Sequence, residues 1–212
     1  SARGEHQSAL DAFQRALALD PASWSAAFNL GTTNLRRGRE TGERAFFDEA
    51  ERWLRASLAI RPGATRSEWY LAEVHFELGR LDEAETAFRR LAATSPRLFE
   101  MTRYPLAHLA LARGDHQAAE ARYREALRSG TDPVAARLGL ARLAAALGRP
   151  EEARREARRA MQERPHDPEP HLFLARLDPG TPAALRHLFE AERRGYRPTP
   201  AEREAILARR RA

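Results

Sequence analysis

The sequence predicts an all-α fold, an α-solenoid in which antiparallel helix pairs stack one on the next. The first observation is an alanine that recurs at intervals of 41, 34, 35, 34 and 31 residues. The six positions are Ala9, Ala50, Ala84, Ala119, Ala153 and Ala184. A local pattern that returns about every 34 residues is typical of stacked helical repeats, in which each unit buries its apolar face against its neighbours.

Each repeated alanine lies on the apolar face of a predicted helix, the second helix of its unit. The positions four and seven residues later are also apolar or small, and this spacing places all three on one side of a helix. The residues four positions later are Phe13, Leu54, Phe88, Tyr123, Ala157 and Leu188. Those seven positions later are Ala16, Ser57, Leu91, Ala126, Ala160 and Ala191. We therefore expect six second helices in one right-handed stack, with no β-strand.

Prolines and glycines set the limits of the units. A proline twelve or fourteen residues after each alanine ends the second helix, and these are Pro21, Pro62, Pro96, Pro133, Pro165 and Pro198. A glycine stands five residues before the alanine, where the first helix must end, at Gly4, Gly79, Gly114 and Gly148. The predicted units of this single domain span about 1–21 (a second helix only), 22–62, 63–97, 98–133, 134–166 and 167–198, with a terminal helix over 199–212.

In this register the chain resembles the tetratricopeptide repeat (TPR) family, whose pattern is a small residue after leucine, then A-x3-F and a closing proline. The leucine pairs of the first helices are Leu71-Ala72, Leu106-Ala107 and Leu140-Ala141, with Leu30-Gly31 and Leu174-Ala175 displaced. The resemblance covers nearly all 212 residues. It implies a superhelix of antiparallel helix pairs, in which the first helices line a concave wall and ligands lie against that wall.

The sequence departs from the TPR pattern in three places. No first helix precedes the helix predicted over residues 6–19, so we expect a piece of a longer protein. An apolar flank of that helix is then expected to be exposed and to join two copies of the chain. Seven extra residues precede Ala50, close to two helical turns, and the last unit has a shortened first helix.

The extra residues predict an early start for the following helix, near Glu43, so that it projects beyond the stack. At least one of Phe46 and Phe47 would then be exposed as a second contact site, since adjacent residues point about 100 degrees apart. The alternative is that both rings fold back on the adjoining first helix.

Composition limits the classes of function. The chain is 42% apolar and 31% charged, and no stretch approaches the ~18 apolar residues of a membrane span. Without cysteine it has neither disulfides nor thiolate metal sites. The net charge of +6 comes from arginines that interleave with acids, as at Glu151 and Arg155, which is typical of a solvated helix face. A nucleic-acid ligand is therefore not favoured.

No motif for catalysis, a cofactor or a metal ion is recognisable. The sequence has no G-x-S-x-G, no glycine-rich phosphate loop, no H-E-x-x-H and no cysteine nucleophile. His116 and Glu120 are four residues apart on one predicted helix, but the spacing supplies no third metal ligand. We expect neither an enzyme nor a cofactor-binding protein.

Three rows of residues on the predicted first helices are expected to face the concave wall. The row two residues before the leucine is large and apolar: Phe28, Trp69, Tyr104, Leu138 and Leu172. The row two residues after it is polar: Thr32, Glu73, His108, Arg142 and Arg176. The third row is Leu35, Phe76, Leu111 and Ala145. Such a wall suits an extended peptide or a partner helix, whereas the alternative is that the aromatic row packs as core.

The resemblance adds Asn29, at a position where TPRs often bond a peptide backbone. The carboxylate clamp of chaperone-binding TPRs is rich in lysine, and the matching residues Phe28, Thr32, Tyr70, Met101 and Pro105 do not reproduce it. We predict a protein-protein interaction scaffold, with a regulatory or targeting arm of a larger enzyme or of a secretion or assembly complex as the alternative. The predicted groove residues are Phe28, Asn29, Thr32, Trp69, Tyr70, Glu73, Phe76, Tyr104, His108, Arg142 and Arg176.

Overall fold

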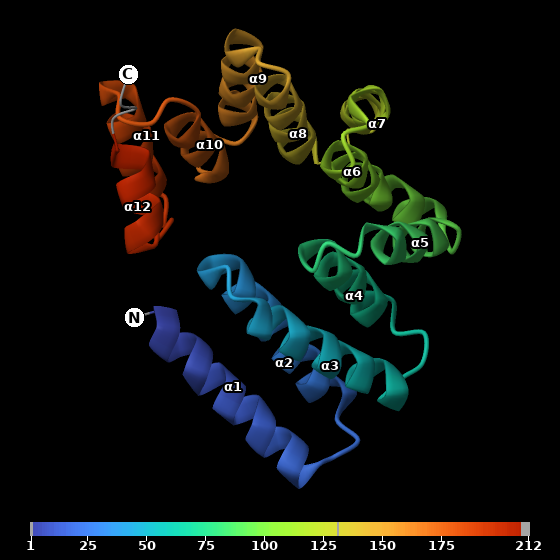
Figure 1. Ribbon diagram of the computed structural model, residues 1–212. Helices are drawn as coiled ribbons and strands as arrows, with labels where there is room; N and C mark the ends of the chain where they lie inside the picture. The colour runs from blue at the N-terminus through green and yellow to red at the C-terminus, as the bar shows by residue number, and fades with distance from the viewer. Residues whose placement is uncertain (1, 131, 209–212) are drawn as a thin grey trace. The chain divides into compact units, whose positions relative to one another are not determined.

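The computed structural model describes residues 2–130 and 132–208 of the chain. These residues form twelve α-helices and no strand, which confirms the predicted fold class (Figure 1). The chain divides into two compact units, residues 1–102 and residues 103–212. Each unit is built from consecutive helices that pack on their neighbours in the sequence.

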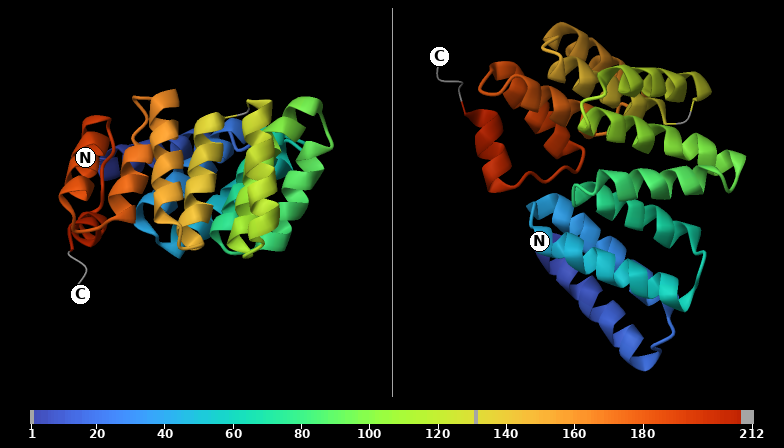
Figure 2. Two further views of the ribbon diagram at one scale, coloured as in Figure 1. Left: turned by 90° about the horizontal axis from the view of Figure 1, so that it is seen from above. Right: turned by 45° about the vertical axis from the view of Figure 1, so that its right-hand side comes forward.

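Unit 1 contains five complete helices and the start of a sixth. They are α1 (Ala2–Leu19), α2 (Trp24–Thr41), α3 (Arg44–Ile60), α4 (Thr65–Glu77), α5 (Leu81–Ala92) and α6 (Pro96–Ala112), the last of which continues into unit 2. Each of α1 to α4 packs against the helix that follows it. In Figure 2, α2 and α3 run alongside each other as an antiparallel pair.

Unit 2 continues the same alternation of first and second helices. Its helices are α7 (His116–Ser129), α8 (Pro133–Ala146), α9 (Pro150–Glu163), α10 (Glu169–Leu177), α11 (Pro182–Arg193) and α12 (Pro200–Leu207). The first helix α10 has only nine residues, in line with the shortened first helix of the last repeat. Five of these helices, α8 to α12, carry proline in the first turn, where its missing N–H costs no hydrogen bond.

The repeated alanines lie at the contact between the two helices of a pair. The five in the second helices from α3 onward are 0% exposed: Ala50, Ala84, Ala119, Ala153 and Ala184. The residues four positions later are at most 3% exposed: Leu54, Phe88, Tyr123, Ala157 and Leu188. The predicted buried face of the second helices is therefore the core of the protein.

Glycine on a neighbouring first helix makes room for two of these large side chains, Leu54 and Tyr123. A Cβ atom added to Gly139 of α8 would lie 2.2 Å from the Tyr123 ring, and one added to Gly31 of α2 would lie 2.6 Å from Leu54 Cγ. These distances are shorter than van der Waals contact allows. The helices can approach so closely only because neither position has a side chain.

The extra residues before Ala50 lengthen both helices of their pair. The helix α2 has 18 residues and α3 has 17, against 13 in α4 and 12 in α5. The start of α3, directly after Glu43, lies where the sequence predicts it. The prediction that α3 projects beyond the stack is wrong, because the lengthened α2 lies alongside the first turn of α3.

The two phenylalanines fold back on α2 as a result. Phe47 is 8% exposed, and a Cβ atom on Gly38 would lie 2.6 Å from its ring. Phe46 is half-buried, with the Arg37 guanidinium 4.2 Å from its ring centroid. Phe47 is thus a core residue and not the contact residue that the sequence predicts. A role for Phe46 in binding stays a prediction.

The helix α1 exposes less apolar surface than the sequence predicts. Leu10 is 7% exposed, Phe13 and Leu17 are half-buried, and α1 packs against α2. Leu19 at the end of α1 is 88% exposed. Association of two copies through α1 stays a prediction.

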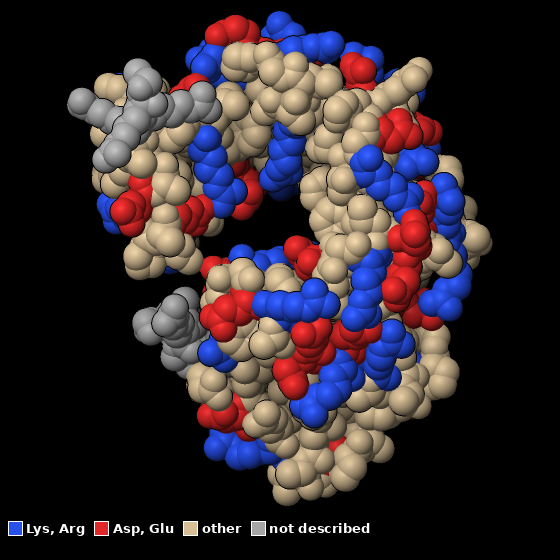
Figure 3. Space-filling model, in the orientation of Figure 1, with Lys and Arg blue, Asp and Glu red and all other residues tan. Residues whose placement is uncertain are grey.

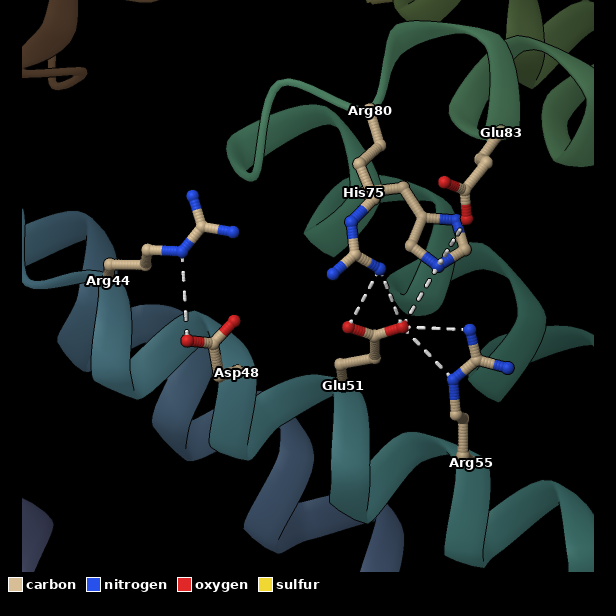
Figure 4. Close-up of polar contacts among 7 residues, drawn as sticks. All are labelled: Arg44, Asp48, Glu51, Arg55, His75, Arg80 and Glu83. Atoms are coloured by element: carbon tan, nitrogen blue, oxygen red, sulfur yellow. Dashed lines mark hydrogen bonds and ion pairs between the residues drawn. The ribbon is translucent and has the colours of Figure 1, made fainter.

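Glu51 of α3 is the centre of a polar cluster that joins α3 to α4 and α5 (Figure 4). Its carboxylate accepts hydrogen bonds from Arg55 at 2.8 Å and from Arg80 at 3.0 Å. His75 Nε2 lies 3.6 Å from this carboxylate and 3.8 Å from that of Glu83. Burial raises the pKa of Glu51, but the hydrogen bonds and charges of Arg55 and Arg80 outweigh burial and hold the pKa below its usual value.

Acid is expected to destabilise unit 1 through His75. Burial lowers the pKa of His75, and Arg55 and Arg80 lower it further, against the attraction of Glu51 and Glu83. The unfolded chain therefore binds a proton more readily as the pH falls through the ordinary histidine value of about 6.5, and the free energy of unfolding falls with it.

A His75→Gln variant should show a smaller fall in Tm between about pH 7.5 and about pH 5.5 than the unchanged chain. Thermal unfolding followed by circular dichroism at both pH values measures this. His171 and His187 are present in both proteins, and burial lowers the pKa of each, so their contributions cancel in the comparison. An equal fall in Tm in both proteins would contradict the role of His75.

Candidate functional site

The apolar row predicted to face a ligand is partly core. Phe28, Leu138 and Leu172 are 5%, 4% and 1% exposed. Phe28 of α2 meets the Tyr70 ring edge-on at a centroid distance of 5.5 Å and packs in one cluster with Val74 of α4. The prediction that Phe28 faces a ligand is therefore wrong, because this side of α2 packs on the next first helix.

Trp69 and Glu73 form a polar surface on α4 with residues of α2. The indole Nε1 of Trp69 donates a hydrogen bond of 2.8 Å to Glu73 Oε1, while its ring packs edge-on against Phe88 at 5.3 Å. Arg39 of α2 donates to Glu73 at 3.1 Å and to Glu77 at 2.6 Å. Burial lowers the pKa of Arg39, but the two carboxylates raise it above its usual value, so the guanidinium stays charged.

The other predicted residues of unit 1 are half-buried on α2 and α4. They are Asn29, Thr32, Tyr70 and Phe76. The Thr32 hydroxyl donates to the carbonyl oxygen of Asn29 at 3.2 Å, so it is engaged within its own helix. Tyr70 presents one side to Phe28 and so contributes to the core as well as to the surface.

In unit 2, Tyr104 and His108 of α6 form a stacked pair. Their ring centroids are 5.8 Å apart and their planes differ by 15°. Arg142 of α8 donates a hydrogen bond of 3.3 Å to the Tyr104 hydroxyl, and its guanidinium lies 3.9 Å from a carboxylate oxygen of Glu169 on α10. Three of the predicted residues are thus brought together across two first helices, and Tyr104, His108 and Arg142 are all half-buried.

Arg176 of α10 belongs to a second, separate arrangement. It donates to Glu202 of α12 at 3.0 Å and to the Tyr196 hydroxyl at 3.4 Å. The Tyr196 hydroxyl donates to Glu202 at 2.6 Å. Burial and the bond to Glu202 raise the pKa of Tyr196, so the phenol stays protonated. The donors of Arg176 are therefore largely occupied by the protein itself.

Sequence reasoning missed the partners that fix these side chains. Arg39, Glu77, Glu169, Tyr196 and Glu202 lie outside the three periodic rows. Glu202 has two roles, a local one in a helix cap and a second one in contacts with residues outside its own helix. Its backbone N–H donates to the Thr199 side chain in a helix cap. Its carboxylate accepts hydrogen bonds from Arg176 of α10 and from Tyr196 in the loop before α12.

No cluster of three or more histidine, cysteine, aspartate or glutamate side chains in residues 2–130 and 132–208 fits a metal ion. Within the same residues, no helix combines the length and the apolar character that crossing a lipid bilayer requires.

Family models place the chain among known repeats. A tetratricopeptide repeat model matches residues 47–98 and 110–177, and a second model of the same repeat matches residues 1–57. The chain belongs to the tetratricopeptide repeat family. No curated protein matches this TPR chain in sequence.

Solved TPR structures share its fold. A tetratricopeptide repeat protein from Parabacteroides merdae is 22% identical with a TM-score of 0.59, over 97% of this chain and 80% of that one. PilW, a type IV pilus biogenesis factor, is 18% identical with a TM-score of 0.60, over 91% and 84%. A chain of the Cut9–Hcn1 hetero-tetramer of APC/C is 18% identical with a TM-score of 0.62, over 96% and 39%. Identities this low show the shared fold alone.

Proposed function

We propose that this TPR chain is a protein-interaction scaffold that binds a peptide or a partner helix along its first helices. The observation that supports this most is the arrangement of Tyr104, His108 and Arg142 in unit 2. A stacked aromatic pair stands beside a guanidinium that one hydrogen bond of 3.3 Å holds in place. Tyrosine and arginine, together with tryptophan, are enriched among the residues that anchor protein interfaces.

The chemistry of this surface fits a peptide that combines an apolar side chain with a carbonyl or carboxylate group. The ring faces offer apolar contact, and the guanidinium offers several N–H donors in one plane. Arg142 makes one hydrogen bond to Tyr104 and a longer ion pair with Glu169. It therefore has donors left for a ligand, whereas Arg176 is engaged by Glu202 and Tyr196.

The charge distribution favours a protein ligand over a nucleic acid. On the face drawn in Figure 3, arginine and acidic side chains alternate over the helices of unit 1. Within unit 1, Arg39, Arg55 and Arg80 each form a salt bridge with a glutamate. A nucleic-acid surface would instead gather unpaired cations along one face.

A peptide display selection on the immobilised chain tests the proposal. Selected peptides should bind a Tyr104→Ala, Arg142→Ala variant at least about ten-fold more weakly than the unchanged chain, because both anchors are lost. Fluorescence anisotropy of labelled peptides measures the change in Kd. The matched control is Arg124→Ala on the second helix α7, where Arg124 pairs with Glu120 at 2.5 Å.

The control variant should bind within about two-fold of the unchanged chain, a difference that corresponds to well under 1 kcal/mol. Circular dichroism should show equal helix content in all three proteins. Peptides that bind the double variant as tightly as the unchanged chain would contradict a ligand site on α6 and α8.

A further inference from the structure

Two neighbouring aromatic rings of α2 each have an arginine over them. The Arg61 guanidinium lies 4.8 Å from the centroid of the Trp24 ring. The Arg66 guanidinium lies 4.8 Å from the centroid of the Phe28 ring. Both distances are within the roughly 6 Å over which a cation and an aromatic ring attract one another. Arg61 directly follows α3 and Arg66 is in the first turn of α4, so the end of one helix and the start of the next meet at α2.

The two rings form a fixed support for these arginines. The centroids of Trp24 and Phe28 are 6.2 Å apart, and Phe28 meets the Tyr70 ring edge-on at 5.5 Å. Phe28 is 5% exposed, and both Trp24 and Tyr70 pack against the core cluster that contains it. Because the rings belong to the core of unit 1, the guanidiniums over them are held in defined places.

Both guanidiniums are exposed and have no polar partner. Neither Arg61 nor Arg66 forms a hydrogen bond or a salt bridge within residues 2–130 and 132–208. Glu68, two residues after Arg66, pairs instead with Arg90 at 3.1 Å. A guanidinium that lies over a ring keeps the N–H donors on its edges available. We call Arg61 and Arg66 the stacked arginine pair.

Other arginines of unit 1 that lie over rings do have polar partners. Arg37 lies over an aromatic ring and donates a hydrogen bond of 3.3 Å to Gln7. Arg52 lies over the Trp53 ring and pairs with Glu49 at 2.7 Å. Contact with a ring therefore does not by itself leave an arginine without a partner in this unit. The stacked arginine pair differs in having two positioned cations side by side in the structure and no acid to neutralise them.

We propose that the stacked arginine pair binds two acidic side chains of a segment of a partner protein. Each guanidinium can offer a carboxylate two parallel N–H donors. Alternate side chains of an extended segment are about 6.6 Å apart, which is similar to the 6.2 Å between the two ring centroids. This surface lies in unit 1, and its acidic ligand goes beyond the peptide site proposed on α6 and α8.

A single-stranded nucleic acid fits this surface less well than an acidic protein segment. Proteins that bind such strands stack the bases on exposed aromatic rings. Here Phe28 is 5% exposed, and a guanidinium lies over each ring. A ligand can reach the edges of the guanidiniums but not the ring faces, so a nucleic acid would lose its base stacking.

Three labelled peptides of one length, with blocked ends that carry no charge, serve as probes. The first has glutamate at alternate positions, the second has glutamine in place of each glutamate, and the third has lysine in place of each glutamate. A single-stranded RNA of mixed sequence is the fourth probe. Fluorescence anisotropy at several salt concentrations measures the Kd of each probe.

The glutamate peptide should bind the unchanged chain, and its affinity should fall as salt is added. Arg61→Gln, Arg66→Gln should weaken this binding at least about ten-fold and flatten its salt dependence. The matched control is Arg37→Gln, Arg52→Gln, which removes the same charge and also takes two guanidiniums from rings of unit 1. The control should bind the glutamate peptide within about two-fold of the unchanged chain.

Circular dichroism should show equal helix content in the unchanged chain and both double variants, since Arg61 and Arg66 are exposed. If Arg61→Gln, Arg66→Gln loses helix content, the two single variants take its place. Each single variant should then weaken binding at least about three-fold.

The proposal is overturned if the glutamate peptide does not bind, or if the glutamine or lysine peptide binds as tightly. An equal loss in both double variants would also overturn it, since net charge alone would then attract the peptide. RNA that binds more tightly than the glutamate peptide, and only when Arg61 and Arg66 are present, would assign the surface to a nucleic acid. The Tyr104→Ala, Arg142→Ala variant should bind the glutamate peptide like the unchanged chain, so the two proposed sites are tested independently.

Discussion

Replacing Tyr123 by alanine is expected to lower the free energy of unfolding by about 3–5 kcal/mol. The Tyr123 side chain is 0% exposed and fills the space above Gly139, where a Cβ atom would lie 2.2 Å from the ring. Its ring also packs on Tyr104 at a centroid distance of 6.0 Å. Removing the ring leaves a cavity that α7 and α8 cannot close without moving together. Urea unfolding followed by circular dichroism measures the loss.

Tyr123→Phe is the matched control for this prediction. The Tyr123 hydroxyl is buried and has no hydrogen-bond partner among the described residues, and burial raises the pKa of the phenol. Removing a buried, unpaired hydroxyl relieves a desolvation cost of about 1–3 kcal/mol. Tyr123→Phe should therefore leave stability unchanged or raise it. If Tyr123→Phe costs as much as Tyr123→Ala, the hydroxyl and not the ring stabilises the pair.

Leu54→Ala is expected to cost about 2–5 kcal/mol, the second-largest effect. Leu54 is 0% exposed and its Cγ would lie 2.6 Å from a Cβ atom on Gly31. In Gly31→Ala alone, this overlap should lower the free energy of unfolding by about 1–3 kcal/mol. Alanine is favoured over glycine inside a helix by roughly 1 kcal/mol, and this gain offsets part of the loss.

The double variant Gly31→Ala, Leu54→Ala tests whether these two residues act on one another. The new methyl group would occupy part of the cavity left by the leucine, so the combined loss should be smaller than the sum by about 1 kcal/mol or more. Urea unfolding of the four proteins in this cycle gives the coupling energy. Additivity within about 0.3–0.5 kcal/mol would show that the two helices do not meet at this pair.

Most of the fold was predictable from the residues that recur with the repeat. The repeated alanines, the residue four positions after each and the closing prolines follow from the packing of one helix on its pair partner, which is the same in every unit. The start of α3 after Glu43 was predictable because an insertion of nearly two turns keeps Ala50 and Leu54 in phase. The matching extension of α2 was not, since no periodic residue marks its end.

The candidate site was less predictable for a physical reason. A row of five large apolar residues arises both from a ligand-facing wall and from the contact between successive first helices, so Phe28 and Trp69 look alike in the sequence. The structure separates them, since Phe28 is core while Trp69 is half-buried and bonded to Glu73. The contacts of Arg39 and Arg142 join residues more than 25 positions apart in the chain, beyond the reach of helix periodicity.

Hydrogen–deuterium exchange with a peptide from the display selection tests most directly whether ligands lie on the first helices. Bound peptide slows the exchange of amides that it covers or whose helix it stabilises. The account predicts slower exchange in α6 and α8, around Tyr104 and Arg142, with little change in the second helices α7 and α9. Slower exchange confined to α7 and α9, with α6 and α8 unchanged, would contradict it.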